Sequence, residues 1–338
     1  MSARTAAPTR AVVLLVGGVI LLAAAVLGSL MIGARPVPPH IVWEALAAPV
    51  SGDPDHIVVL TQRVPRTVIG ALAGAALAVA GGLMQGITRN PLADPGLLGV
   101  NAGASVAVLA AITFAGLTQP GGFVWFAFLG AAVAAVGVFL IGGTGRDGAD
   151  PTKLALTGAA VTAGLTSVSM LILTTDTNAL NIYRFWSVGS LTGRGLDTAA
   201  ALSVPVLIGI VVALLCASSL NLLALGEATA RGLGHSTTRT RVLVISIVVV
   251  LCGAATAIAG PLVFVGLVVP HLTRAVVGTD YRWIIATAIP LGAALLLIAD
   301  IIGRTVVAPA ELEAGLVVAF IGAPVLMTLV LRRRMVTL

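Results

Sequence analysis

The sequence predicts an all-α integral membrane protein with about ten transmembrane helices. Of its 338 residues, 9% are charged and 58% are apolar, whereas a soluble protein carries roughly a quarter charged residues. The few charges separate long uncharged blocks, and a helix needs about 20 mostly apolar residues to cross a bilayer. Strands of a membrane barrel would alternate apolar and polar residues, but a stretch such as 71–80 is apolar on every face. Helices are therefore favoured over a barrel.

Two of the uncharged blocks are too long for a single crossing. Block 95–145 is interrupted by the turn-forming stretch 118–122, and block 242–273 is interrupted at 259–261 by a Gly-Pro pair. The composition shows no break that would mark a second domain, so residues 1–338 are expected to form one polytopic domain. The expected spans are 11–33, 64–87, 96–116, 123–143, 153–174, 197–217, 241–258, 261–277, 283–303 and 313–331.

The basic residues predict the orientation of these spans. An even number of spans places both termini on one side, and with the termini in the cytoplasm 13 of the 19 basic residues are internal and six are external. This distribution agrees with the preference for basic residues on the inner side of a membrane. It also accounts for the net charge of +6, and since no basic stripe carries interleaved aromatic residues, no nucleic acid partner is expected.

Residues for covalent chemistry are sparse. Cys216 and Cys252 lie in apolar blocks without a Cys-x-x-Cys spacing, and the four histidines are scattered, so no disulfide framework, metal site or catalytic cluster is expected. A nucleotide-binding P-loop ends in Gly-Lys-Ser/Thr, but the only lysine, Lys153, lies between Thr152 and Leu154. The chain is therefore not expected to be an enzyme or to hold a cofactor, and any ATP-driven step must come from another polypeptide.

The internal loop at about 219–240 is the first candidate functional segment. Residues 227–231 predict a short helix on the membrane surface, bracketed by two glycines that act as natural helix breaks. Such a helix either lies passively at the interface or docks a soluble partner on the cytoplasmic side. The candidate contact residues are Gly226, Glu227, Ala230, Arg231, Leu233 and Gly234.

Two other internal segments combine proline with polar residues. The span that begins at 261 contains two prolines, a histidine and Arg274, where proline kinks a helix and cationic groups in lipid must face protein or water. The stretch 89–99 has two more prolines and predicts a rigid turn. These segments serve either as interfacial anchors and kinks or as part of a gate. The candidates for the translocation path or gate are Met84, Gln85, Asn90, Pro91, Leu92, Pro270 and His271.

Three external arginines, Arg63, Arg66 and Arg304, run against the orientation preference. Two explanations are open. They form salt bridges within the chain, for which Asp300, Glu311 and Glu313 are available. Alternatively, they are sockets for acidic residues of an external binding protein, where charge pairs steer docking more than they add affinity.

Taken together, these segments resemble the FecCD family of ABC importer permeases, which serve iron–siderophore, haem and vitamin B12 uptake. The matching motifs stand in family order across residues 62–324, most of the chain, and one departure is Glu313, where the family usually has proline. The motifs are Arg63-Val-Pro-Arg66, Gln85, Arg89–Pro95, Leu98-Gly99, Trp186–Leu191, Leu225–Ala230, Leu233-Gly234, Gly260–His271, Arg274, Ala299-Asp300, Arg304 and Gly322-x-Pro324.

The resemblance implies a type II ABC importer permease bundle of ten helices in a bacterial plasma membrane, working with a second permease subunit as a homodimer or a paralogous heterodimer. It also implies two ABC ATPase subunits, which bind the ATP and magnesium, and an extracytoplasmic substrate-binding lipoprotein. By the same resemblance, the loop around Gly226–Gly234 is similar to the coupling helices that contact the ATPases, and the three external arginines look like the docking sockets.

A ferric siderophore is the expected cargo, with haem or cobalamin as the alternative within the family. An ion-coupled secondary transporter would be a different class and would need ionisable groups near the membrane midplane. The 13 acidic residues fall at expected helix ends or in loops, with Asp300 the nearest to the midplane. An integral membrane enzyme would need a catalytic cluster, which the sequence does not offer.

Overall fold

The computed structural model describes residues 8–143 and 151–331, and every regular element within them is a helix. The helices are α1 (Pro8–Met31), α2 (Pro39–Ala47), α3 (Pro54–Val58), η1 (Val59–Arg63), α4 (Val64–Thr88), η2 (Pro95–Leu98), α5 (Val100–Ala115), α6 (Pro120–Gly142), α7 (Pro151–Thr175), α8 (Thr177–Ser187), α9 (Leu196–Ala224), α10 (Glu227–Gly232), α11 (Thr237–Ala259), α12 (Val265–Val277), α13 (Tyr281–Val306) and α14 (Ala314–Leu331).

A helix of the structure occupies each of the ten expected spans. Seven helices of the described chain are long and apolar enough to cross a membrane, and they include the continuous helix 54–88. The helices in the other three expected spans, α5, α12 and α14, are shorter. With 13 residues, α12 extends only about 20 Å, less than the roughly 30 Å of a hydrocarbon core. Ten crossings and the cytoplasmic position of the termini therefore stay predictions.

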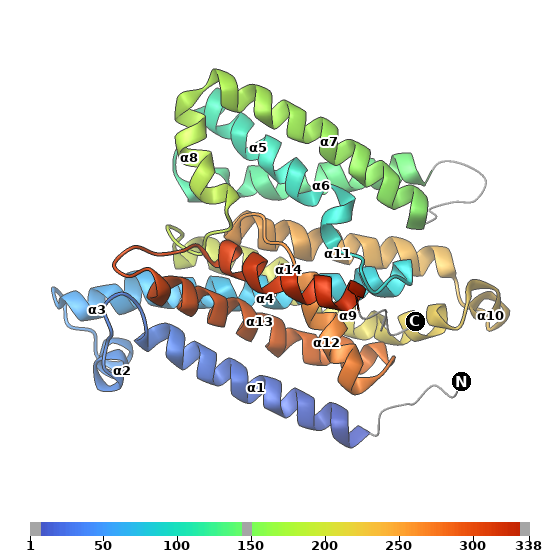
Figure 1. Ribbon diagram of the computed structural model, residues 1–338, viewed down its shortest axis with the longest axis horizontal. Helices are drawn as coiled ribbons and strands as arrows, with labels where there is room; N and C mark the ends of the chain where they lie inside the picture. Colours follow the sequence, from blue (N-terminus) through green and yellow to red (C-terminus); the bar gives the residue numbers. More distant parts are fainter. Residues whose placement is uncertain (1–7, 144–150, 332–338) are drawn as a thin grey trace.

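Helix α4 forms the centre of the bundle. It packs against α13, α11, α9 and α12, and most of its residues are buried. Helices α5, α6, α7 and α8 form a separate layer that joins the centre mainly through α11 (Figure 1). Helix α1 lies on the opposite side, against α13. The sequence of α4 suits this position, because alanine and glycine allow several neighbouring helices to approach it closely.

Glycines mark the closest helix crossings. A Cβ atom on Gly74 of α4 would lie 2.3 Å from the carbonyl oxygen of Gly292 on α13, and a Cβ on Gly292 would lie 2.4 Å from the carbonyl oxygen of Gly74. A Cβ on Gly81 would meet the carbonyl oxygen of Gly266 on α12 at 1.8 Å. At these positions only glycine fits, because a larger residue would collide with the backbone of the neighbouring helix.

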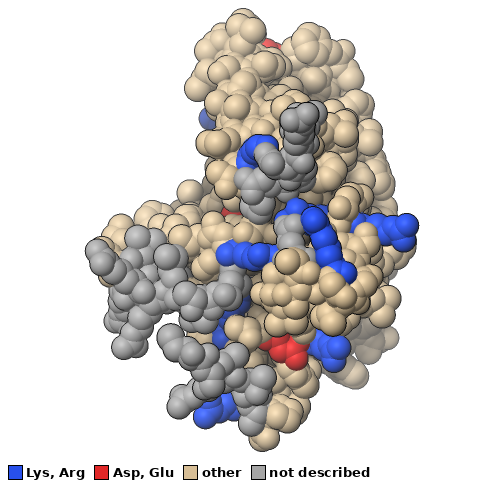
Figure 2. All heavy atoms as spheres, turned by 90° about the vertical axis from the view of Figure 1, so that its right-hand side faces the viewer, with Lys and Arg blue, Asp and Glu red and all other residues tan. Residues whose placement is uncertain are grey.

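The two ends of the bundle differ in their elements. Helix α1 begins and α14 ends at the end that carries α10, here called the α10 end, and the opposite end carries α2 and α3, here called the α2 end (Figure 1). Basic side chains are prominent on the view of the α10 end (Figure 2). The described basic residues expected inside are Arg10, Arg89, Lys153, Arg231, Arg239, Arg241, Arg274 and Arg282. The others expected there, Arg4, Arg146, Arg332, Arg333 and Arg334, lie outside the described residues.

Three short helices, α2, α3 and α8, were not expected between the apolar blocks. Asp176 caps α8 by accepting a hydrogen bond from the backbone N–H of Ala179 at 3.0 Å, and Thr113 of α5 donates to the same carboxylate at 2.8 Å. The hydrogen bond from Ala179 lowers the pKa of Asp176. Asp53 caps α3 in the same way, through the backbone N–H groups of Asp55 and His56. Side-chain caps thus begin α3 and α8, whereas α2 begins without one.

Candidate functional site

A buried ion-pair network lies at the α2 end. Nε of Arg66 on α4 lies 2.8 Å from Oδ1 and 3.0 Å from Oδ2 of Asp300 on α13, and Nη1 donates to Glu311 at 2.7 Å. Nη2 of Arg304 lies 2.9 Å from Oδ2 of Asp300, and it also donates to the hydroxyl of Ser29 at 2.8 Å. The carboxylate of Asp300 is completely buried between the two arginines.

Arg63 belongs to the same region but uses backbone acceptors. It ends a π-helical turn, η1, which precedes Pro65 in the long helix 54–88. Its guanidinium donates to the carbonyl oxygens of Leu30 (2.6 Å) and Arg35. The structure therefore brings the three expected docking arginines to one end of the bundle. All three are buried and have partners within the chain, so the salt-bridge explanation is present for Arg66 and Arg304.

The α2 end also contains a polar cavity of about 480 Å³. Its walls include Arg66, Glu311, the end of the helix before α4 and the loop that connects α8 to α9. One wall residue, Arg194, was not singled out from the sequence. The available signal was a single arginine between two glycines, 193 and 195, directly after the Trp186–Leu191 motif. Without the fold, that signal does not indicate that Arg194 and Arg66 line the same cavity.

The expected surface helix is present as α10 at the opposite end. Gly226 precedes it with a positive φ of 106°, which favours glycine, and Gly234 follows it with a φ of 77°. The backbone N–H of His235 donates to the carbonyl of Ala230 and that of Gly234 to Arg231, which is a Schellman motif. Helix α10 packs on α9 and α11 through the buried Ala230.

Two leucines beside α10 face away from the bundle. Leu225 is 63% exposed and Leu233 is 64% exposed, whereas the Nε atom of Arg231 points back to the hydroxyl of Thr237 at 3.4 Å. The backbone places Glu227 at the first position of the helix. The expected contact segment is thus a short helix held by the bundle and flanked by exposed apolar side chains.

The gate candidates Gln85 and Pro270 meet at the interface between α4 and α12. Pro270 has no N–H, so the carbonyl oxygen of Gly266 loses its normal partner four residues later. Nε2 of Gln85 lies 3.4 Å from this oxygen and 3.2 Å from the carbonyl oxygen of Leu267. Gln85 is fully buried and therefore compensates for the proline kink.

His271 and Arg274 follow on the same short helix and are also buried. Arg274 donates from Nη2 to the hydroxyl of Tyr281 at 3.1 Å, and its guanidinium carbon lies 5.4 Å from the centre of that ring. Nδ1 of His271 has no hydrogen-bond partner among the described residues. Two polar residues of α12 thus face protein rather than lipid, as expected for polar groups in this span.

The remaining gate candidates form the turn after α4. The side chain of Asn90 accepts a hydrogen bond from the backbone N–H of Leu92 at 3.0 Å, and Pro91 is buried. Met84 is buried near the end of α4, and its carbonyl oxygen accepts a hydrogen bond from the hydroxyl of Thr88, one helical turn later, at 2.6 Å. The rigid turn expected from the sequence is present. Its hydrogen bond, between Asn90 and Leu92, is separate from those that Gln85 makes to α12.

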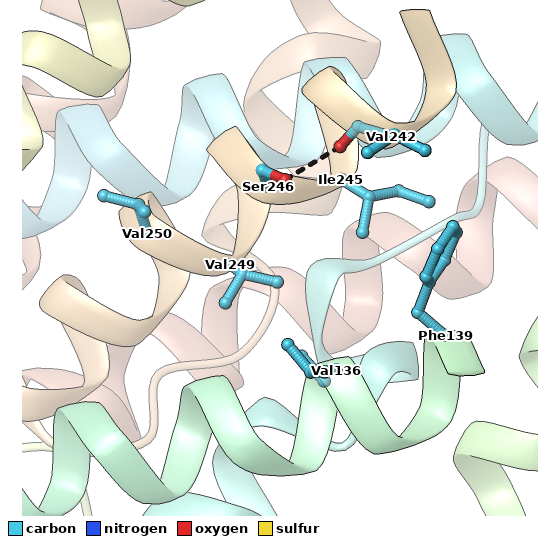
Figure 3. Close-up of a pocket in the computed structure, with 8 residues that line it drawn as sticks. Val136, Phe139, Val242, Ile245, Ser246, Val249 and Val250 are labelled. Carbon is cyan, nitrogen blue, oxygen red and sulfur yellow. Dashed lines mark hydrogen bonds between the residues drawn. The ribbon is translucent and has the colours of Figure 1, made fainter. Parts of the chain in front are cut away.

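A groove of about 260 Å³ between α6 and α11 is apolar (Figure 3). Val136, Phe139, Ile245 and their neighbours line it, and its one hydroxyl, that of Ser246, donates to the carbonyl oxygen of Val242 in its own helix at 2.9 Å. The groove therefore has no polar group directed at a ligand. Across the described part of the chain, no group of three or more His, Cys, Asp or Glu side chains could hold a metal ion.

Comparison with known proteins places these features in a family. The FecCD transport family model matches residues 20–332. The chain is 45% identical to the ferric enterobactin transport system permease protein FepD of Escherichia coli K12 over 94% of both chains. It is 38% identical to the probable siderophore transport system permease protein YfiZ of Bacillus subtilis, covering 93% of this chain and 94% of the relative.

Two more similarities concern the range of cargo and the fold. The chain is 36% identical to the hemin transport system permease protein HmuU of Yersinia pestis, with 93% of this chain and 94% of the relative covered. A solved metal-chelate type ABC transporter in an inward-facing conformation matches with a TM-score of 0.82 at 29% identity, covering 94% of this chain and 98% of the other.

Proposed function

The chain belongs to the FecCD transport family, and from this membership we propose that it is the membrane-spanning permease subunit of an ATP-driven importer of ferric siderophores. The observation that carries the proposal is the 45% identity to a ferric enterobactin permease along nearly the whole of both chains. Relatives of this kind are permease components of ABC transporters and are not enzymes themselves, because the ATPase activity belongs to other subunits.

The proposal assigns the α10 end to the ATPase partners. Helix α10 is a short helix at the surface. The exposed side chains of Leu225 and Leu233 offer an apolar surface that a partner protein could cover. Two ABC ATPase subunits would bind here and supply the ATP and magnesium chemistry. Movement of α10 would then reach the core through α9 and α11, on which it packs.

The proposal assigns the α2 end to the external binding lipoprotein. A second permease subunit would complete the translocation path. The arginine cluster of Arg63, Arg66 and Arg304 gives this end three positive groups, and Asp300 holds two of them in place. Gln85, Pro270 and His271 would belong to the gate. The proline interrupts the backbone hydrogen bonds of α12 there, and the side chain of Gln85 on α4 donates to the carbonyl oxygens in their place.

Uptake by the reconstituted complex tests the proposal. The permease, its ATPase and its binding protein are placed in liposomes, and uptake of radioactive iron as ferric enterobactin is measured with ATP enclosed. We expect uptake that needs ATP and the binding protein and that continues after an ionophore removes the proton gradient. Haemin and cyanocobalamin are run in parallel as competing cargo.

Three outcomes would contradict the proposal. Uptake by the permease alone, uphill and without an ATPase, would remove it from the ABC importers. Loss of uptake with the ionophore while ATP is maintained would indicate ion coupling. Transport of haemin or cobalamin, but of no ferric siderophore offered, would keep the importer and overturn the cargo.

A further inference from the structure

The loop between α8 and α9 contains a buried arginine whose guanidinium is only partly used. Arg194 is 6% exposed, and its Nη1 donates to the carbonyl oxygens of Ser190 (2.5 Å) and Thr192 (3.3 Å). Among the described residues, none accepts a hydrogen bond from its Nε or Nη2, and none forms an ion pair with it. Of these two atoms Nε is fully buried, and a buried donor of a charged group without an acceptor destabilises the fold.

The unused atoms of Arg194 are the ones best suited to a carboxylate. Nε and Nη2 lie on one edge of the guanidinium, where their N–H groups run in parallel and match the two oxygens of a carboxylate. At Arg66, another residue of the cavity wall, Nε and Nη2 both lie within 3.0 Å of the Asp300 carboxylate. Arg66 is matched by acidic residues of the chain, and Arg194 is not.

Arg194 also lines a space that could admit a ligand. The polar cavity at the α2 end is walled by Arg194 on one side and by Arg66 and Glu311 on another, with Thr61 and Thr192 adding hydroxyl groups. Its volume of about 480 Å³ is large enough for a carboxylate side chain or a small organic anion. The cavity therefore has at its wall an arginine whose Nε and Nη2 have no acceptor among the described residues.

The charge of Arg194 is retained at neutral pH. Burial lowers the pKa of Arg194 to about 10, and the charge of Glu313 acts in the opposite direction. Burial also raises the pKa of Glu313. Since Glu313 forms no ion pair with Arg194, the positive charge at the cavity wall stays without a bound partner.

We propose that this cavity is a carboxylate-binding site in which Nε and Nη2 of Arg194 hold the ligand. The site itself follows from the geometry, whereas its source rests on the proposed function. One source is an acidic side chain of the external binding protein, and the other is a carboxylate of the transported chelate. Both present the same group to the same edge of Arg194.

Binding of glutarate to the purified permease in lipid nanodiscs tests the site. The thermal unfolding midpoint is followed against glutarate concentration, with sodium chloride replaced so that the ionic strength is constant. We expect a saturable rise for the wild type. Arg194→Gln and Arg194→Lys should weaken glutarate binding by about tenfold or more, because a charged hydrogen bond contributes about 1.5–3 kcal/mol and lysine lacks the paired edge.

Two matched variants sharpen the comparison. Arg184→Gln removes the same charge from an exposed position on α8 and should bind glutarate as the wild type does. Glu311→Gln removes the carboxylate on the opposite wall and should leave binding unchanged or tighten it. Arg194→Lys keeps a charge at the position and carries the comparison if Arg194→Gln does not fold. Equal glutarate affinity in the wild type and the Arg194 variants, or no effect of glutarate in the wild type, would overturn the site.

Competition against bound glutarate separates the two sources. Displacement by the cargo-free binding protein assigns the site to a protein side chain, and displacement by ferric citrate, used as a carboxylate-bearing chelate, assigns it to the cargo. Displacement by neither would overturn the role of this carboxylate site in import. The glutarate measurement requires no transport, so a failed uptake assay would contradict the proposed function and leave the site intact.

Discussion

Arg66 and Asp300 are 234 positions apart in the sequence, yet Nε of the arginine lies 2.8 Å from Oδ1 of the carboxylate inside the bundle. Asp300 also pairs with Arg304, so one buried carboxylate balances two buried guanidinium groups on α4 and α13. This arrangement joins the two most closely packed helices of the core at the α2 end. It also decides which substitutions can test docking without disturbing the fold.

Asp300→Asn should lower the stability of the permease strongly. Two buried guanidinium groups would lose their counter-charge, and breaking a buried ion pair by removing one partner costs about 3–5 kcal/mol. The thermal unfolding midpoint in detergent measures the loss, with Glu44→Gln as a control that removes a carboxylate from an exposed position on α2. Equal midpoints for Asp300→Asn and the wild type would show that the pair does not stabilise the fold.

Gln85→Met should destabilise the contact between α4 and α12 by about 1–3 kcal/mol, because the carbonyl oxygen of Gly266 would be buried without a donor. Pro270→Ala restores a backbone N–H at the position that normally serves this oxygen. The cost of Gln85→Met should therefore be smaller in the Pro270→Ala background. Unfolding midpoints of the four proteins give the coupling, and additive effects would argue against this compensation.

Gly74→Ala should destabilise the core by about 1–3 kcal/mol or more, because the new Cβ would lie 2.3 Å from the backbone of α13. Gly82→Ala on the same helix is the control, since its nearest neighbour would be 3.8 Å away. Circular dichroism during heating compares the two variants. Similar midpoints would mean that α4 and α13 can separate at little cost.

Glu227→Arg should reduce transport-coupled ATP hydrolysis without loss of expression. The substitution places a positive charge at the start of α10, where the helix dipole favours a negative one, and alters the surface proposed to meet the ATPase. ATP hydrolysis and uptake are measured in the reconstituted complex. Glu44→Arg at the α2 end is the control, and full coupling in Glu227→Arg would refute the role of this segment.

Docking at the α2 end should depend on Arg63 and on ionic strength. Replacing Arg66 by Glu would place a new carboxylate beside Asp300 and disturb the fold, so Arg63→Gln is the cleaner variant. We expect slower association of the binding protein with nanodisc-held permease and a weaker salt dependence, because charge chiefly steers the encounter. Arg184→Gln should match the wild type, and unchanged association in Arg63→Gln would remove this residue from docking.

The sequence predicts the apolar helices well because hydrophobic length is a local property. The expected span 64–87 corresponds to α4 at Val64–Thr88, and the short helix at 227–231 is present as α10. The start of α12 was misjudged, because Phe264 adopts a positive φ of 70° and the helix begins only at Val265. A Cβ on Gly322 of α14 would lie 2.4 Å from the side chain of Phe264, so this turn depends on packing between distant segments.

The candidate site was predictable only in part, because it too depends on packing between distant segments. Arg63, Arg66 and Arg304 stand out as basic residues on the expected outer side, but their shared partner and their burial follow from the crossing of α4 and α13. Arg194 carries no comparable signal, because its importance comes from a cavity formed by three separate segments. Local patterns therefore indicate elements, and contacts across the bundle define the site.

The two cysteines of the chain, Cys216 on α9 and Cys252 on α11, are both buried in the apolar core. Surface labelling can consequently begin from the natural sequence, without first removing native thiols. A maleimide fluorophore on a cysteine introduced at the exposed Leu233 would test the proposed contact with the ATPase, and one at the exposed Thr192 would report changes at the α2 end. A pair of such dyes would allow both faces to be followed in a single transport cycle.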